Sequence, residues 1–232
     1  MITQTIKRRL AGFLARQIVH PVEDLANEQI FQQIFSQQCS NWQIRNDFYP
    51  VGGAASYSLM YLLFRLLTEK RIDSIVEFGS GQSTILIDRL HSDAARHVCY
   101  EDDPGWHAAV SKKVARCDYR LCPLEQRVID GVTCRAYSGV TPIEFDLALV
   151  DGPRGVDQYS RFGCIDTIRS NPRKDFVIVF DDCNRPGEVQ TIRVVEEVLA
   201  AKNIEFEKRE LGGRNHQAVL AAGDFKNVLY YW

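Results

Sequence analysis

Four acidic residues of this sequence stand where short apolar runs end, a placement that suits chemistry. Glu101, Asp151 and the pair Asp181-Asp182 each come directly after such a run. Carboxylates accept hydrogen bonds from hydroxyl groups, act as general bases and bind hard divalent cations. The ends of parallel strands meet at one edge of a sheet, so these side chains are expected to line a common site.

A glycine-rich turn joins the run 74–78 to a helical pattern. Gly79 and Gly81 permit a tight turn and let a ligand approach the backbone, and a helix that starts near Ser83 offers free amide donors. The dinucleotide-binding fingerprint requires a third glycine where this chain has Thr84. The turn therefore predicts a nucleoside-type ligand, with pyrophosphate binding disfavoured.

The elements that must position these residues follow from Ile72 onward, where short β-rich runs alternate with helical patterns. This alternation is typical of βαβ units, and the four-residue link 212–215 suits an antiparallel pair. We expect an α/β fold with a doubly wound, mostly parallel seven-stranded sheet and an antiparallel last strand. The predicted strands are Ser74–Phe78, His97–Glu101, Val132–Tyr137, Leu147–Val150, Phe176–Phe180, Phe206–Leu211 and Gln217–Ala222.

Helical patterns precede this region, so residues 1–70 are predicted to form a helical extension and residues 71–232 the main domain. One helix ends before Pro21, a second follows it, and a third covers residues 54–69. Downstream, Asp103-Pro104 should start a helix that reaches Arg116. The first helix has a basic face and an apolar stripe, which favours packing on the domain or on a second copy, with an anionic membrane surface as the alternative. The stripe consists of Ile6, Leu10, Phe13, Leu14 and Ile18.

The composition excludes several classes. The 28 basic and 30 acidic residues provide no positive field for a nucleic acid, and no run is long enough for a transmembrane segment. Seven scattered cysteines without a CxxC pair favour reduced thiols. We therefore expect a cytoplasmic protein.

Together, the turn Glu77-x-Gly79-x-Gly81 and Glu101, twenty residues beyond it, resemble the first two motifs of class I S-adenosylmethionine (SAM)-dependent methyltransferases. The resemblance covers residues 72–222. It implies that Gly79 and Gly81 face the methionine and ribose of SAM, that Glu77 supports the amino group and that Glu101 binds the ribose. It also implies that the cofactor is contacted by Ser83, Tyr137, Ser138 and Asp151.

One aspartate after the fourth strand and an acidic pair after the fifth are similar to metal-dependent small-molecule and sugar O-methyltransferases. By this resemblance Asp151, Asp181 and Asp182 would hold Mg²⁺ or another divalent cation. The alternative is that Asp151 acts as a metal-free general base. His216 is a second candidate for the acceptor pocket or for a base, and Arg154 would suit an acidic acceptor.

The functional hypothesis is therefore SAM-dependent O-methylation of a small molecule or saccharide hydroxyl, by a protein that also forms a homodimer. Two alternatives stay open. One is a nicotinamide-dependent oxidoreductase, which shares the glycine turn and the acidic residue after the second strand. The other is a cofactor-binding protein of the same fold without turnover.

Overall fold

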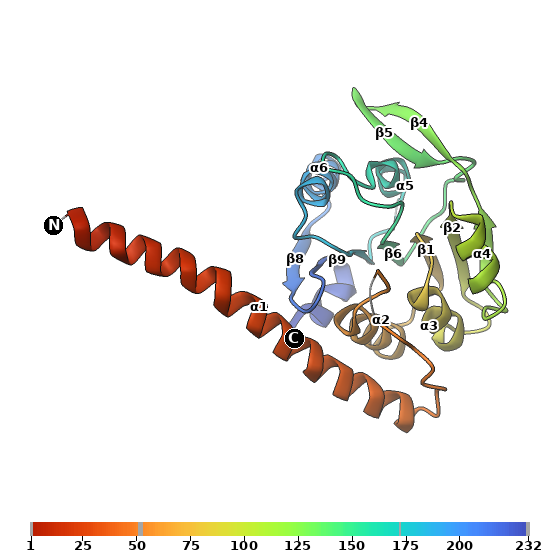
Figure 1. The fold of residues 1–232 in the computed structure, drawn as a ribbon. Helices are drawn as coiled ribbons and strands as arrows, with labels where there is room; N and C mark the ends of the chain where they lie inside the picture. The colour runs from red at the N-terminus through yellow and green to blue at the C-terminus, as the bar shows by residue number, and fades with distance from the viewer. Residues whose placement is uncertain (1, 51–52, 172, 231–232) are drawn as a thin grey trace.

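A seven-stranded sheet forms the centre of the computed structural model, which describes residues 2–50, 53–171 and 173–230, with side chains from Val22 onward (Figure 1). The strand order is β3-β2-β1-β6-β7-β9-β8. All neighbours are parallel up to β7, and β9 runs antiparallel between β7 and β8. The strands are β1 Ser74–Phe78, β2 Arg96–Glu101, β3 Asp118–Leu121, β6 Leu147–Val150, β7 Phe176–Phe180, β8 Phe206–Leu211 and β9 Gln217–Ala222. The predicted fold class is confirmed.

The central strands are buried throughout and mostly apolar because helices cover both faces of the sheet. In β1, Ile75 belongs to one core and Val76 to the other, and in β6 Leu149 and Val150 divide in the same way. Continuous burial on two faces is what distinguishes a parallel sheet from an alternating, half-solvated one.

Two helical layers enclose this sheet. The first core includes side chains of α1 Ile2–Asn41, α2 Tyr57–Glu69, α3 Gln82–Leu90 and α4 Pro104–Val110. The second core includes α5 Ile165–Ser170 and α6 Pro186–Ala201. Short 3-10 turns, η1 Phe162–Cys164 and η2 Gly223–Tyr230, complete the described helices. The N-cap predicted at Asp103 is confirmed, since its Oδ1 accepts from the amide of Trp106 at 2.7 Å.

The strand order reverses between β1 and β6, and the two chains come very close where these strands end. Gly79 has φ +85°, and a Cβ built there would lie 2.6 Å from the Gly152 nitrogen. A Cβ on Gly152 would lie 2.5 Å from Gly79 Cα. Neither position has room for a side chain, so both glycines are needed for the fold at this switch point.

The third strand of the sheet is not the one predicted. Residues 132–137 form β5 Val132–Tyr137, which pairs with β4 Leu124–Ile129 in a separate antiparallel hairpin. The sheet position is filled by β3, a short, half-exposed edge strand with little apolar pattern. An Asp130-Gly131 turn with positive φ at both residues joins β4 to β5. That dipeptide is a strong hairpin signal and would have revealed β4.

Two predicted helix boundaries are also wrong. The backbone of α1 continues from Ile2 to Asn41 through position 21 instead of breaking there. A proline removes one helical hydrogen bond, and packing of Phe35 and Cys39, both fully buried, stabilises the later turns of α1. Helix α4 ends at Val110, six residues before Arg116, because amides of the following loop donate to the buried Asp88 carboxylate.

Helix α1 extends beyond the domain at its N-terminal end (Figure 1). Its Glu28 carboxylate accepts from the amides of Tyr57 at 2.6 Å and Arg214 at 3.1 Å, which anchors it. The stripe predicted at Ile6, Leu10, Phe13, Leu14 and Ile18 lies outside the described side chains. Val22, Leu25 and Ile30 of α1 are exposed to solvent. Membrane contact and dimerisation through this helix stay predictions. No described helix combines the length and apolar character needed to cross a bilayer.

The close approach of Gly79 and Gly152 predicts unequal tolerance within the glycine turn. Gly79→Ala should lower the free energy of unfolding by at least about 2 kcal/mol, because it adds a positive-φ penalty to a backbone clash. Gly81→Ser should change it by less than about 1 kcal/mol, because a Cβ there meets only Trp106 at 3.7 Å and serine is a favoured N-cap. Urea unfolding compares them, and equal losses would contradict the prediction.

Candidate active site

A cavity of about 840 Å³ opens at the carboxyl ends of β1, β2, β6 and β7. This is the edge where open α/β sheets bind ligands, and the volume lies within the usual range for small-molecule sites. Of the residues predicted from sequence, the cavity wall includes Gly79, Glu101, Tyr137, Asp151, Asp181 and Asp182. The edge of the sheet thus brings together residues that are up to about a hundred positions apart.

Glu101 connects the glycine turn to the end of β2. Its Oε2 accepts from the amide of Ser80 at 3.0 Å and from the Ser80 hydroxyl at 2.6 Å. Its Oε1 accepts from the amides of Asp102 and Asp103, both at 2.9 Å. The carboxylate is therefore held rigidly at the cavity wall. Asp102 lines the same wall, and burial together with the Glu101 charge raises its pKa.

Tyr137 presents a buried hydroxyl to this cavity. The side chain is 3% exposed, and its oxygen has no hydrogen-bond partner among the described residues. Burial, with the Glu101 charge, raises the pKa of Tyr137, so the hydroxyl stays protonated and available as a donor. A buried hydroxyl without a protein partner can bind a ligand, a water molecule or an ion. Ser138, predicted beside it, is not part of the wall, and its amide donates to the Pro123 carbonyl at 2.9 Å.

Three predicted cofactor residues, Glu77, Gly81 and Ser83, are not part of this cavity wall. Glu77 is fully buried, where Oε1 accepts from the Ser83 hydroxyl at 2.7 Å and Oε2 lies 3.0 Å from His97 Nε2. Gly81 lines a smaller cavity of about 170 Å³ beside Trp106. Glu77 and Ser83 are thus placed to support the turn from the sheet side.

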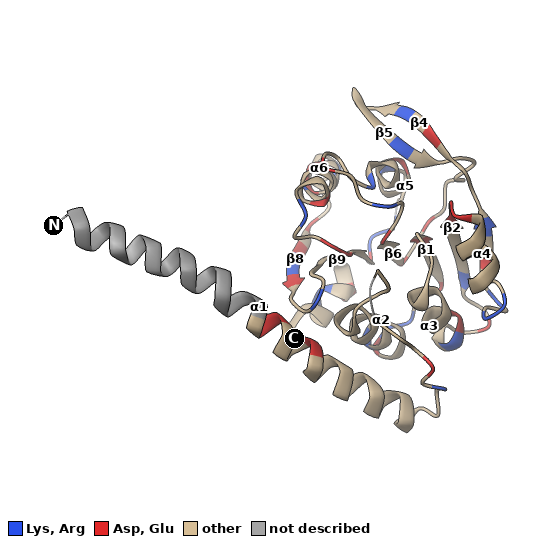
Figure 2. Ribbon diagram, viewed as in Figure 1, with Lys and Arg blue, Asp and Glu red and all other residues tan. Residues whose placement is uncertain are grey.

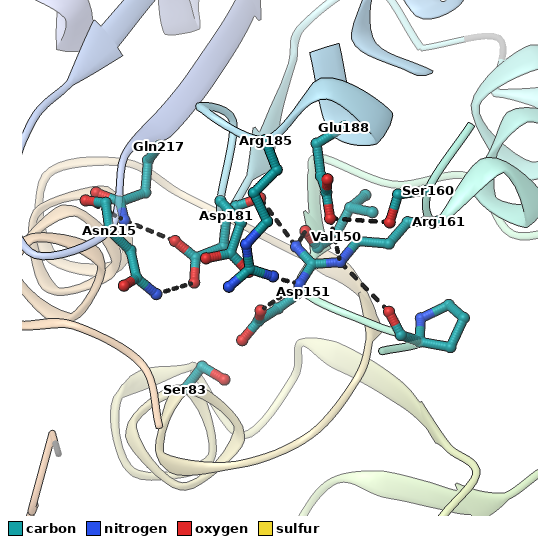
Figure 3. Close-up of polar contacts among 12 residues, drawn as sticks. Ser83, Val150, Asp151, Ser160, Arg161, Asp181, Arg185, Glu188, Asn215 and Gln217 are labelled. Atoms are coloured by element: carbon teal, nitrogen blue, oxygen red, sulfur yellow. Dashed lines mark hydrogen bonds and ion pairs between the residues drawn. The ribbon is translucent and has the colours of Figure 1, made fainter. Parts of the chain in front are cut away.

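The acidic residues after β6 and β7 converge as predicted. One oxygen from each of Asp151, Asp181 and Asp182 lies within 4.8 Å of the others. Asp181 is 1% exposed, and its oxygens accept from Gln217 Nε2 at 2.6 Å and Asn215 Nδ2 at 3.3 Å (Figure 3). Sequence reasoning missed these two amides, because β9 reaches the site only through its antiparallel insertion beside β7.

Arg161 lies at the centre of the cluster (Figure 3). The sequence analysis did not identify this residue. Its NH2 lies 2.8 Å from Asp182 Oδ2 and 3.3 Å from Asp151 Oδ1. Its NH1 donates to the carbonyls of Val150 at 3.3 Å and Asp181 at 2.9 Å. The guanidinium therefore ties the end of β6 to the end of β7.

The loop that carries Arg161 is fixed to the start of α6. Glu188 is 1% exposed, accepts from the Ser160 hydroxyl at 2.8 Å and lies 3.7 Å from Arg161 Nε. A Cβ on Gly187 would lie 2.3 Å from the Val156 carbonyl oxygen, so the loop packs directly on the helix. Sequence spacing gives no signal for this contact because Ser160 and Glu188 belong to different elements.

Burial and like charge govern protonation here. Burial, reinforced by Asp181, raises the pKa of the Asp151 carboxyl well above its ordinary value, and Arg161 opposes that rise. Burial and Asp182 raise the pKa of Asp181 in the same way. Burial disfavours the charge of Arg161, but Asp151 and the other carboxylates outweigh it and raise the pKa of Arg161. The arginine is thus a permanent cation among carboxyl groups that compete for it.

The three carboxylates have the chemistry of a site for a hard divalent cation, but their oxygens already have partners. Asp182 Oδ2 lies 2.8 Å from guanidinium nitrogens of both Arg161 and Arg185. Asp181 is occupied by two amides and Asp151 faces Arg161. An added dication within bonding distance would lie beside two guanidinium groups and be repelled by them. The residues present therefore do not fit a divalent metal ion.

His216, predicted as a possible base, is not part of the cavity wall. Its Nε2 lies 3.0 Å from Asp24 Oδ2 of α1, and its carbonyl accepts from the Cys183 amide. These contacts tie the loop before β9 to α1. A catalytic role for His216 stays a prediction.

Comparison with known proteins assigns the fold. No family model and no curated protein matches this sequence. Among solved structures, it is similar to an O-methyltransferase from Bacillus cereus in complex with S-adenosylhomocysteine, at 16% identity over 90% of this chain and 96% of that one, with TM-score 0.50. It is also similar to a precorrin-6y C5,15-methyltransferase from Geobacter metallireducens, at 15% identity over 76% and 94%, with TM-score 0.51. The chain has the fold of class I SAM-dependent methyltransferases.

The raised pKa of Asp151 predicts that Asp151→Asn stabilises the protein at neutral pH. Below the ordinary aspartate pKa of 3.8, the residue is protonated in both folded and unfolded chains. Above that pH the unfolded wild type ionises while the folded protein keeps the proton, so wild-type stability falls until the pH passes the higher pKa of the folded state. The advantage of the variant in urea unfolding should therefore grow as the pH rises above 3.8 and level off once Asp151 ionises in the folded protein.

Asp157→Asn is the matched control for this experiment, because Asp157 is exposed in the same loop. Its stability should follow that of the wild type at every pH. An advantage of Asp151→Asn that shrinks with rising pH would contradict the assignment.

Proposed function

We propose that this protein transfers the methyl group of SAM to a hydroxyl oxygen of a small molecule. The observation that supports the proposal is that a single cavity is lined both by residues suited to binding the cofactor and by a carboxylate that can act as a base. Glu101 and the unpartnered Tyr137 hydroxyl line one side of the cavity, and Asp151 lines it at the switch point. Their chemistry fits the donor, since a carboxylate suits ribose hydroxyls and a phenol hydroxyl suits an adenine nitrogen.

Asp151 is the proposed general base. A hydroxyl is a poor nucleophile until its proton leaves, and a carboxylate with a raised pKa takes that proton more readily than an ordinary one. When bound, SAM supplies a sulfonium-linked methyl group, whose carbon–sulfur bond breaks with its electron pair on sulfur as the acceptor oxygen bonds to carbon. Asp151 then returns the proton to water. The cavity wall fixes the reacting groups relative to each other.

The acceptor is proposed to be a small molecule, with a sugar bearing an acidic group as the finer suggestion. Arg154 lines the cavity, is exposed, and forms no ion pair with a described residue, so it can bind a carboxylate or phosphate on the acceptor. A nucleic acid is disfavoured, because basic and acidic residues are interspersed along the described chain (Figure 2).

The main alternative is a nicotinamide-dependent oxidoreductase, and ligand stabilisation separates the two. S-adenosylhomocysteine at about 100 times its dissociation constant should stabilise the fold by about 2.7 kcal/mol in a thermal-shift assay. NAD should give no shift, because Thr84 replaces the glycine that a pyrophosphate requires. Stabilisation by NAD alone would refute the proposal. Transfer of label from methyl-labelled SAM to a panel of acidic sugars and phenols tests turnover and distinguishes an enzyme from a cofactor-binding protein.

Glu101→Ala should weaken S-adenosylhomocysteine binding by about 10- to 100-fold in calorimetry, as expected for loss of a charge-assisted contact. Because Glu101 also holds the glycine turn, Ser80→Ala is the matched control. It removes the two hydrogen bonds of the Ser80 hydroxyl, to Glu101 and to the Tyr119 hydroxyl, and keeps the carboxylate. A smaller loss in Ser80→Ala would support direct ligand binding by Glu101. Equal losses of affinity in the two variants would mean that Glu101 only supports the glycine turn.

A further inference from the structure

Arg161 has features that a simple loop residue lacks. Its side chain is 3% exposed, although it carries a full charge. Its backbone has φ 60°, in the left-handed region, and so does Asp182, the carboxylate it binds. Non-glycine residues rarely adopt this conformation, and such strain concentrates at functional sites. Two residues with this strained backbone conformation are thus joined by a 2.8 Å ion pair at the cavity edge, which favours a functional role for the pair.

The guanidinium group also has the geometry that a metal ion would otherwise provide. It bridges the carboxylates that follow two neighbouring strands, and it holds the carbonyls of Val150 and Asp181 that end those strands. A planar group with five fixed donors can bind four such partners at once, whereas a lysine ammonium has three rotating donors. The position of Asp151 at the cavity therefore depends on Arg161.

We propose that Arg161 serves as the resident cation of the acidic cluster in place of a divalent metal ion, so that methyl transfer is metal-independent. The proposal rests on the function proposed above. Arg161 is a positioning residue, which acts by holding Asp151 and Asp182 at the edge of the sheet. Four acidic groups and two arginines meet here, so removal of Arg161 leaves a strongly negative pocket with the ligands of a divalent cation.

Direct Mn²⁺ binding tests this without any methyl donor or acceptor. Electron paramagnetic resonance of the full chain titrated with Mn²⁺ should detect no bound ion in the wild type. Arg161→Gln should gain a site at least about tenfold tighter than any in the wild type, and Arg161→Gln with Asp151→Asn should lose it again. Arg161→Lys keeps the positive charge and should bind no Mn²⁺. This variant provides a measurement if Arg161→Gln does not fold. Stoichiometric Mn²⁺ binding by the wild type would overturn the proposal.

Turnover gives the second measurement. Wild-type transfer should be unchanged in chelator. Arg161→Gln should lower kcat by about 100-fold with little change in the KM for SAM, and Arg161→Lys should recover part of it. Loss of wild-type activity in chelator, restored by Mg²⁺, would overturn the proposal. If no acceptor is ever methylated while the Mn²⁺ results hold, the proposed function fails and the role of Arg161 as resident cation stands.

Discussion

The backbone contact between Gly79 and Gly152 is the constraint on which the candidate site depends. Strands β1 and β6 are neighbours at the switch point, and their chains leave the sheet in directions that bring these two residues together. Because neither carries a side chain, the edge can open into a cavity above them. Glu101 reaches that cavity from β2 and Asp151 from β6. A larger residue at either glycine would separate the strands that place both carboxylates.

Charge is the second constraint, because the buried carboxylates must be balanced by other side chains of the same protein. Asp151, Asp181 and Asp182 come together because the two parallel strands β6 and β7 end at one edge, and burial makes their mutual repulsion strong. Arg161 compensates for that repulsion, with Gln217 and Asn215 saturating Asp181. Burial, reinforced by the charge of Asp181, raises the pKa of Asp151, which is the property a general base needs. The same electrostatics therefore supports the geometry and the proposed chemistry.

The sequence supported six of the seven sheet strands: five through apolar runs that are buried almost throughout, and the polar edge strand β8 through its short link to β9. It failed at β3, where an edge strand is half-solvated and has no such pattern, and at the extent of α4, where the tertiary contact of Asp88 ends the helix. The continuity of α1 through position 21 likewise depends on packing that occurs farther along the helix.

For the site, the sequence by itself determined which carboxylates reach the edge of the sheet. Glu101, Asp151, Asp181 and Asp182 follow apolar runs, and strand ends in a parallel sheet necessarily meet. Only the tertiary structure decided what those carboxylates bind. Arg161 lies within an irregular loop, and its position results from Ser160 and Glu188 holding that loop to α6. No local pattern encodes a contact between separate elements, so the sequence left both a metal site and a metal-free base open, and the contacts of Arg161 became visible only in the tertiary structure.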